Sequence, residues 1–249
     1  MSDNILLVTG GSRGIGAATA RLAAQQGWAV AVNYTANSLA ADEVVRAIRA
    51  AGGTAMAAQA DVADEAQVLA MFERIDAKLG PITGLVNNAG VVDVTARLDE
   101  QSVARWRRMF DINVIGSLLC AREAVRRMST RHGGAGGAIV NVGSAAARLG
   151  SPGQYVDYAA AKGAIDAFTL GLAKEVAGEG IRVNAVRPGL IETEIHAAGG
   201  WPNRVAELQH LVPMQRGGSA DEVAQAIVWL LSDAASYTTM SLIDVSGAR

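Results

Sequence analysis

Short apolar runs alternate with amphipathic stretches along most of this chain. The apolar runs predict seven strands, at residues 5–9, 29–33, 54–60, 84–89, 137–144, 181–188 and 241–246. The stretches between them predict helices at residues 15–26, 38–51, 64–79, 100–130, 154–177 and 220–231. Such alternation indicates parallel βαβ units, and strands that are apolar on both faces indicate helices on both sides of the sheet. We therefore expect an α/β fold with a doubly wound, seven-stranded parallel sheet.

The 249 residues show no change of composition that would mark a linker, so we expect a single domain over residues 1–249. The alternation is interrupted over residues 190–219, where "WPNRVAELQH" (201–210) is compatible with a short helix. Long insertions in a compact fold are often functional loops. We therefore expect a substrate loop or lid at about residues 190–215.

Charge and cysteine content exclude several classes of function. The formal net charge of −2 gives no long-range attraction to nucleic acid or to an anionic membrane, and no apolar run is long enough to span a bilayer. The N-terminus lacks the pattern of a signal peptide. Cys120 is the only cysteine, so no disulfide within the chain is possible, which predicts a cytoplasmic protein. The three histidines are scattered, and we expect no metal site.

A glycine-rich loop, "VTGGSRGIG", follows the first predicted strand and opens the first predicted helix. Gly10, Gly14 and Gly16 have the spacing G-x3-G-x-G. Glycines let a pyrophosphate approach the backbone, and the N–H groups at a helix N-terminus attract phosphate. The loop therefore predicts a dinucleotide-binding site.

The end of the second predicted strand indicates which dinucleotide is bound. An acidic residue at this place would bond the ribose 2′-hydroxyl of NAD(H) and repel the 2′-phosphate of NADP(H). Here the strand ends with Asn33 and Tyr34, and no acidic residue occurs before Asp42. Arg13 in the glycine loop could pair with a phosphate. The sequence therefore predicts NADP(H) in preference to NAD(H).

A tyrosine and a lysine share one helix face in "YVDYAAAK". Tyr158 and Lys162 are four residues apart, whereas the position four residues after Tyr155 is an alanine. A nearby ammonium lowers the pKa of a phenol, which makes it a better general acid and base. Ser144, at a strand end, could bond a carbonyl oxygen, and Asn113 is an unusual residue for a helix interior.

Together, the glycine loop, "NNAG" (87–90) and "YAAAK" (158–162) resemble the motifs of the short-chain dehydrogenase/reductase family, over nearly the full length. The resemblance implies a single Rossmann-type domain, an NAD(P)(H) cofactor, and a homo-oligomer that is a tetramer or a dimer. It also implies a catalytic tetrad made of Asn113, Ser144, Tyr158 and Lys162.

The same resemblance assigns the cofactor contacts. Ser12 and Arg13 would lie near the adenosine phosphate, Asp61 and Val62 at the adenine, residues 88–90 at the middle of the cofactor, and residues 188–193 at the nicotinamide carboxamide. The full expected cofactor-binding set is Gly10, Ser12, Arg13, Gly14, Ile15, Gly16, Asn33, Tyr34, Thr35, Asp61, Val62, Asn88, Ala89, Gly90, Tyr158, Lys162, Pro188, Gly189, Ile191 and Thr193.

The expected substrate cleft is lined by Gln154, Tyr155, His196 and Trp201. With Gly150, Ile195 and Met214 nearby, the cleft is mixed apolar and aromatic with little fixed charge, so it favours a small or medium carbonyl or alcohol over a highly charged substrate. Within enzymes, a 3-oxoacyl thioester reductase competes with a dehydrogenase of small ketones or sugars. An acyl-carrier partner would need a basic patch, for which Arg126, Arg127 and Arg131 are candidates. The alternative outside enzymes is a non-catalytic redox sensor that binds NADP(H).

Overall fold

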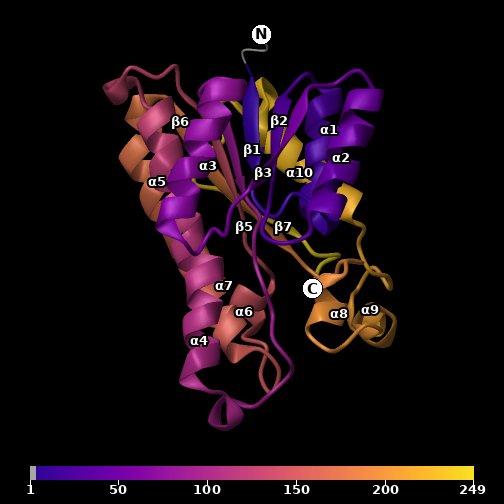
Figure 1. The fold of residues 1–249 in the computed structure, drawn as a ribbon. Helices are drawn as coiled ribbons and strands as arrows, with labels where there is room; N and C mark the ends of the chain where they lie inside the picture. Colours follow the sequence, from indigo (N-terminus) through magenta and orange to yellow (C-terminus); the bar gives the residue numbers. More distant parts are fainter. Residues whose placement is uncertain (1–3) are drawn as a thin grey trace.

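A computed structural model describes residues 4–249, apart from the side chains of His196 and Ala198. Its strands form one parallel sheet in the order β3-β2-β1-β4-β5-β6-β7 (Figure 1). They are β1 (Ile5–Val8), β2 (Ala29–Tyr34), β3 (Ala55–Gln59), β4 (Gly84–Asn87), β5 (Gly137–Val142), β6 (Ile181–Pro188) and β7 (Leu242–Val245). The expected seven-stranded, Rossmann-type parallel sheet is confirmed.

Helices connect the strands and cover both faces of the sheet (Figure 1). The α-helices are α1 (Gly14–Gln25), α2 (Ser38–Ala50), α3 (Glu65–Lys78), α4 (Val103–Phe110), α5 (Gly116–Met128), α6 (Ala146–Leu149), α7 (Val156–Val176), α8 (Ile195–Ala198), α9 (Arg204–Leu208) and α10 (Ala220–Leu231). The long helix expected over residues 100–130 is divided, because a π-helical turn, Asp111–Ile115, separates α4 from α5.

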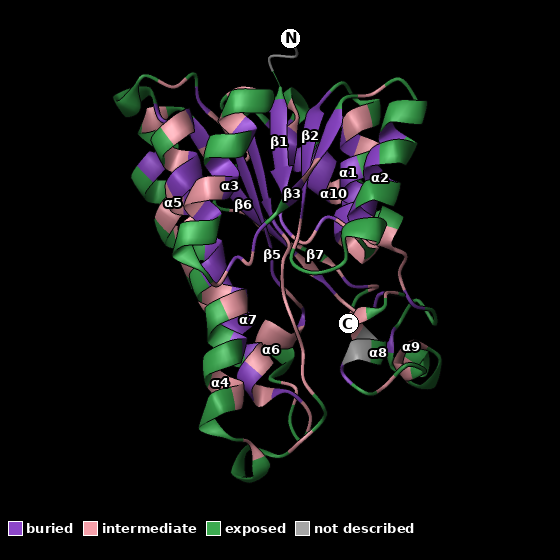
Figure 2. Ribbon diagram, in the orientation of Figure 1, coloured by how far each residue is buried: buried purple, intermediate pink, exposed green. Residues whose placement is uncertain are grey.

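Alternate residues of each strand enter two different cores. Leu6 and Val8 of β1 pack with the buried faces of α1, α2 and α10. Ile5 and Leu7 face the opposite side and pack with those of α3, α5 and α7. Figure 2 shows the buried strands between helices whose outer faces are exposed. Burying a large aliphatic side chain contributes about 1.5–3 kcal/mol, so both cores hold the sheet rigid.

The order of the strands places a crevice at one edge of the sheet. Because every strand is parallel, all the carboxyl ends lie at the same edge. The chain passes outward from β1 through β2 to β3, and then returns to the other side of β1 as β4. Ligands of open α/β sheets bind at such a switch point, beyond the carboxyl ends of the strands.

The segment after β6 leaves this edge and returns to α10, and we call residues 190–218 the lid. The two ends of the lid are joined, because Glu192 N–H donates to Gly218 O and Gly218 N–H donates to Leu190 O, both at 2.9 Å. Between these ends the lid carries α8 and α9 (Figure 1). The short helix expected within residues 201–210 is therefore present as α9.

Candidate active site

The glycine loop turns tightly between β1 and α1. Gly10 and Gly14 have φ values of +59° and +51°, which disfavour residues with a side chain. A Cβ atom on Gly16 would collide with the carbonyl oxygen of Gly10 and lie 2.5 Å from Asn88 Nδ2. The third glycine therefore lets α1 pack directly on the loop and on the end of β4.

The N-terminus of α1 is not capped by a side chain of its own first turn, although Glu194 of the lid lies close to Gly14. Its N-cap, Arg13, makes no capping hydrogen bond through its side chain, and its first turn contains no acidic residue. In α10, by contrast, Ser219 and Glu222 form a capping box that satisfies the first turn. An uncapped helix N-terminus beside close-packed glycines fits the pyrophosphate of a dinucleotide.

Asn33 lies beneath the glycine loop and supports it. The side chain is buried, its Oδ1 accepts from Gly10 N–H at 3.1 Å, and its Nδ2 donates to the carbonyls of Ala58 and Ala60 at 3.1 and 3.0 Å. The sequence predicts Asn33 as a cofactor contact. In the structure its amide instead ties the loop to β2 and to the end of β3.

Asn88 ties the loop to β4 from the other side. Its Nδ2 donates to the carbonyls of Thr9 and Gly10 at 2.9 and 3.0 Å, and its N–H donates to Thr9 Oγ1 at 2.9 Å. Ala89 N–H donates to the same hydroxyl at 3.0 Å. These bonds hold the NNAG motif against the first two residues of the loop.

The residues expected at the adenosine end surround the opening of the loop. Arg13 and Thr35 are exposed, whereas Ser12, Ile15 and Tyr34 are partly exposed. The Arg13 guanidinium makes no hydrogen bond or ion pair with the rest of the described chain. Asp61 Oδ1 accepts from Ala63 N–H at 3.0 Å, and Val62 is buried against Gly116.

Ser144, Tyr158 and Lys162 come together at the carboxyl end of β5. The Ser144 side chain lies close enough to the Tyr158 hydroxyl to lower the pKa of the phenol. Lys162 Nζ donates to the Val142 carbonyl at 2.7 Å and lies 5.6 Å from the centroid of the Tyr158 ring. The structure thus brings together three of the four residues that the sequence predicts as catalytic.

The protonation of this group differs from the expectation. Burial raises the pKa of Tyr158, and it outweighs the bond from Ser144 and the charge of Arg204, which lower it. Burial also lowers the pKa of Lys162 to about 8, against the opposing charge of Asp166. The Lys162 ammonium is hydrogen-bonded to the Val142 carbonyl in this arrangement. Tyr158 is therefore neutral at neutral pH and can donate a proton.

Asn113 lies in the π-helical turn and is fully buried. Its Nδ2 donates to the carbonyls of Val91 and Met109, and its Oδ1 accepts from Val91 N–H at 3.2 Å. A Cβ atom on Gly90 would lie 2.7 Å from Asn113 Oδ1 and 3.6 Å from Lys162 Nζ. Gly90 therefore permits Asn113 to lie beside the group that contains Lys162.

The segment expected at the nicotinamide starts at the end of β6. A Cβ atom on Gly189 would lie 2.7 Å from Ser246 Cα, so Gly189 lets the chain pass close to the C-terminal tail. Pro188 and Ile191 are buried. A Cβ atom on Gly14 would lie 3.3 Å from Thr193 Cγ2, so Thr193 faces the glycine loop across the cleft.

Aromatic residues mark the substrate side of the cleft. Tyr155 is buried and Trp201 is partly exposed, whereas the side chain of His196 lies outside the described residues. Gln154 is partly exposed, and its backbone carbonyl accepts from Ala96 N–H at 3.1 Å.

The expectation of little fixed charge overlooks Arg204, whose guanidinium lies 4.9 Å from the Tyr155 ring centroid and 5.0 Å from that of Trp201. One signal in the sequence could have identified it. Arg204 is the only arginine or lysine between residues 190 and 215.

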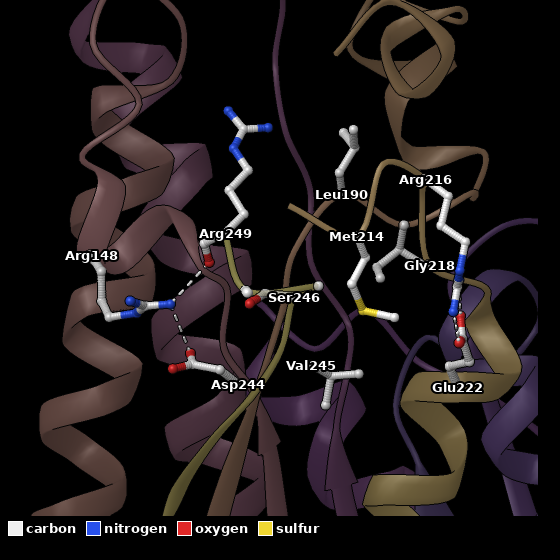
Figure 3. Close-up of a pocket in the computed structure, with 13 residues that line it drawn as sticks. Arg148, Leu190, Met214, Arg216, Gly218, Glu222, Asp244, Val245, Ser246 and Arg249 are labelled. Atoms are coloured by element: carbon white, nitrogen blue, oxygen red, sulfur yellow. Dashed lines mark hydrogen bonds and ion pairs between the residues drawn. The ribbon is translucent and has the colours of Figure 1, made fainter. Parts of the chain in front are cut away.

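A separate cavity of about 460 Å³ lies between the base of the lid and the C-terminal tail (Figure 3). Its lining includes Leu190 and Ile191 of the lid, but none of the four residues expected to be catalytic. Arg148 bonds the carbonyl of Arg249 and pairs with Asp244 on one side of this cavity. The cavity therefore lies beside the expected nicotinamide segment and apart from the reacting groups.

Metal and membrane features are absent from the part of the chain that the structure describes. Within residues 4–249, no group of three or more histidine, cysteine, aspartate or glutamate side chains could hold a metal ion. No described helix is both long enough and apolar enough to cross a bilayer.

Known proteins resemble this chain over nearly its whole length. A family profile described as enoyl-(acyl carrier protein) reductase matches residues 10–247. An uncharacterised oxidoreductase of Escherichia coli strain K12, YgfF, is 59% identical, with 98% of this chain and 99% of that protein covered. A cis-4-hydroxycyclohexanecarboxylate dehydrogenase of Sinomonas cyclohexanicum is 42% identical, with 99% and 96% covered. A solved structure of a Serratia marcescens short-chain dehydrogenase/reductase superposes with a TM-score of 0.91 at 32% identity, covering 99% and 98%.

Proposed function

This chain belongs to the short-chain dehydrogenase/reductase family of oxidoreductases, and from that premise we propose that it interconverts a carbonyl and an alcohol using NADP(H). One observation carries the proposal. Tyr158 lies beside both Ser144 and Lys162 at the carboxyl end of β5, the same edge of the sheet at which the glycine loop opens α1.

The proposed chemistry follows from the properties of these side chains. The nicotinamide, when bound, supplies or accepts the hydride. Tyr158, which burial keeps protonated, donates a proton to the carbonyl oxygen in reduction and takes it back in oxidation. Proton transfer of this kind contributes a factor of about 10² to 10⁴ to the rate. Ser144 bonds the same oxygen and stabilises the charge that develops on it.

Lys162 has two roles in the proposal. Its ammonium holds the ribose hydroxyls of the cofactor, and its charge favours loss of the proton from Tyr158 in the oxidative direction. Its present partner is the Val142 carbonyl, at 2.7 Å, and in the proposal the ammonium exchanges this bond for the ribose hydroxyls when the cofactor binds. Asn113 fixes the position of the neighbouring loop at Gly90 and Val91.

NADP(H) is the proposed cofactor because the glycine loop offers a cation and no acidic residue stands at the end of β2. Arg13 is exposed at the loop opening, and β2 ends in Tyr34 and Thr35. Asn33 supports cofactor binding indirectly, because its side-chain amide is hydrogen-bonded to Gly10, Ala58 and Ala60 beneath the loop.

A small-molecule substrate is favoured over a thioester on a carrier protein. The candidate basic residues for a carrier are paired with acids of this chain: Arg126 and Arg127 with Glu123, Arg127 also with Asp76, and Arg131 with Glu179. They lie at the C-terminal end of α5, close to the start of β5 and therefore at the sheet edge opposite the cleft (Figure 1). A relative that acts on a hydroxycyclohexanecarboxylate supports a compact ring alcohol as the substrate class.

Two further parts of the proposal come from the sequence. We expect a homo-oligomer, either a tetramer or a dimer, and a cytoplasmic location for a chain with one buried cysteine. Light scattering after size exclusion tests the first part, and fractionation of cells that express the protein tests the second.

The test of the function is the oxidation of NADPH with a panel of ketones, aldehydes, quinones and 3-oxoacyl thioesters, with Tyr158→Phe measured in parallel. We expect turnover by the wild type with one class of carbonyl and its loss in the variant, while both proteins bind NADPH equally. Equal turnover by the two proteins would refute the role of Tyr158. Tight NADPH binding without turnover of any carbonyl would favour the redox-sensor alternative.

A further inference from the structure

Arg204 occupies a fixed position on the substrate side of the cleft. Its guanidinium carbon lies 4.9 Å from the Tyr155 ring centroid and 5.0 Å from the Trp201 ring centroid. A cation near the faces of aromatic rings is held there by their quadrupoles. The two rings come from different parts of the chain, since Tyr155 precedes α7 and Trp201 belongs to the lid.

Two hydrogen-bond donors in this place lack a partner. The Nη1 atom of Arg204 and the hydroxyl of Tyr155 are both buried, and neither finds a partner within the described residues. A Cβ atom on Gly199 would lie 3.5 Å from the Tyr155 hydroxyl, so the lid backbone closes over that oxygen. Leaving buried donors unpaired is unfavourable, and an acceptor with several lone pairs would satisfy both.

The carboxylates in the vicinity are already engaged. Glu207 of α9 accepts a hydrogen bond from the Trp201 indole at 2.8 Å. Asp157, close to Tyr155 in sequence, accepts two hydrogen bonds from Arg105. No described acidic side chain forms an ion pair with Arg204, so its charge has no counter-ion from this part of the protein.

A second arginine increases the positive charge. Arg249 has a pKa lowered by burial and by the charge of Arg204, which places the two guanidinium groups within electrostatic reach of each other. In Figure 3 the Arg249 side chain extends away from Arg148 and Asp244. Two neighbouring cations attract an anion.

The position of Arg204 relative to the reacting group determines what the anion could be. The charge of Arg204 acts on the Tyr158 phenol, and Tyr155 is only three residues before Tyr158. An anion held by Arg204 would therefore lie close to the carbonyl that is reduced, on the same side of the cleft as the lid. The adenosine end of the cofactor is expected at Arg13, in the glycine loop.

We propose that Arg204, with the hydroxyl of Tyr155, binds an oxyanion on the substrate, so that the enzyme selects carbonyl compounds and alcohols that carry a carboxylate or a phosphate. This inference rests on the proposed function, which it narrows to anionic substrates. Arg204 is then a specificity-determining residue, because its guanidinium offers a planar fork that matches the oxygens of a carboxylate.

The test uses binding, so that it does not depend on turnover. Benzoate, its neutral analogue benzamide, and phenyl phosphate are titrated by calorimetry into the complex of the full chain with NADP⁺. We expect benzoate to bind at least about tenfold more tightly than benzamide to the wild type. The variant Arg204→Met should lose this preference while NADP⁺ affinity stays unchanged.

Three further variants separate charge, geometry and folding. Arg204→Lys should keep part of the preference, because the ammonium retains the charge but not the fork. Tyr155→Phe should reduce the preference, since it removes one donor and keeps the ring. Arg46→Met removes the same charge from an exposed position on α2 and should leave the preference intact.

The titrations can contradict the inference or support it with a different anion. Equal binding of benzoate and benzamide to the wild type, or a preference for benzoate that survives Arg204→Met, would show that Arg204 does not hold the anion. Tighter binding of phenyl phosphate than of benzoate, lost in Arg204→Met, would support the same site with phosphate as its ligand.

Turnover separates this inference from the proposed function. With keto acids and their carboxamides, we expect kcat/KM of the wild type to favour the acid by about tenfold, and Arg204→Met to be indifferent. Anion binding with no turnover of any carbonyl would refute the proposed function, and with it the assignment of the anion as substrate. Turnover without an anion preference would refute the inference alone.

Discussion

Arg105 and Asp157 form an ion pair whose side chains are only 9% and 2% exposed, with two hydrogen bonds of 2.7 and 3.1 Å between guanidinium and carboxylate. The remaining nitrogen of Arg105 donates to the Val94 carbonyl at 2.6 Å. One arginine of α4 therefore holds both the loop after β4 and the first turn of α7. That turn also carries Tyr158, so the pair positions the proposed proton donor without touching substrate.

Removal of one partner of this pair should be costly. Arg105→Met leaves a buried carboxylate unpaired, and we expect it to lower the free energy of unfolding by about 3–5 kcal/mol in urea denaturation. The double variant Arg105→Met/Asp157→Leu should recover much of this loss. Arg97→Met breaks an exposed pair with Asp99 and should cost less than about 1 kcal/mol. Equal effects in the buried and the exposed pair would contradict this account.

Arg13 should decide between the two cofactors. Arg13→Ala should weaken NADPH binding about tenfold and leave NADH binding unchanged, because only NADPH carries the 2′-phosphate. Fluorescence titration of each reduced cofactor measures both affinities. Arg21→Ala, an exposed arginine of α1, is the matched control. A wild type that binds NADH as tightly as NADPH would refute the preference.

Asn33 should affect both cofactors alike. The isosteric Asn33→Asp removes the two N–H donors and directs a carboxylate at the carbonyls of Ala58 and Ala60. We expect the free energy of unfolding to fall by about 2–4 kcal/mol. NADPH and NADH affinities should fall in parallel, since the glycine loop loses its support. A selective loss of NADPH would instead make Asn33 a direct phosphate contact.

The buried ammonium of Lys162 should lower the free energy of unfolding at neutral pH. Its pKa is lowered from 10.5 to about 8, so the folded state disfavours the ammonium. The resulting loss of stability is complete below pH 8 and disappears as pH rises toward 10.5, because the unfolded chain then also loses the proton. Lys162→Met should therefore be more stable than the wild type at neutral pH by about 1–3 kcal/mol, although inactive.

The pH dependence supplies the check on this prediction. The difference in free energy of unfolding between Lys162→Met and the wild type should shrink as pH rises from 8 toward 10. A constant difference over that range would mean that the charge of Lys162 is not the cause.

The sheet could be predicted from the sequence because its pattern is local. Every expected strand agrees with an observed one to within two residues at each end, since strands covered by helices on both faces are continuous apolar runs. The π-helical turn could not be predicted in the same way. The sequence marks Asn113 as unusual within a helix, but the turn depends on its bonds to Val91, which come from a distant loop.

In the site, too, features set by local spacing could be predicted from the sequence, whereas features that depend on distant residues could not. The spacing of Tyr158 and Lys162 places them on one helix face, whereas the direction of the Lys162 ammonium depends on the Val142 carbonyl in β5. The role of Asn33 depends on carbonyls at the end of β3. Arg204 becomes noteworthy only once the lid folds back and brings its guanidinium over the Tyr155 ring.

The hydrogen bonds at the base of the lid allow the lid to change during evolution without changing the sheet and helix that it connects. Because Gly218 is hydrogen-bonded to both Leu190 and Glu192, the chain enters and leaves the lid at nearly the same point of the sheet edge. A loop closed at its base can change in length and sequence with little effect on the elements that it connects. We therefore expect that an exchange of residues 195–217 between relatives would change substrate selectivity and leave the proposed cofactor contacts, which end at Thr193, in place.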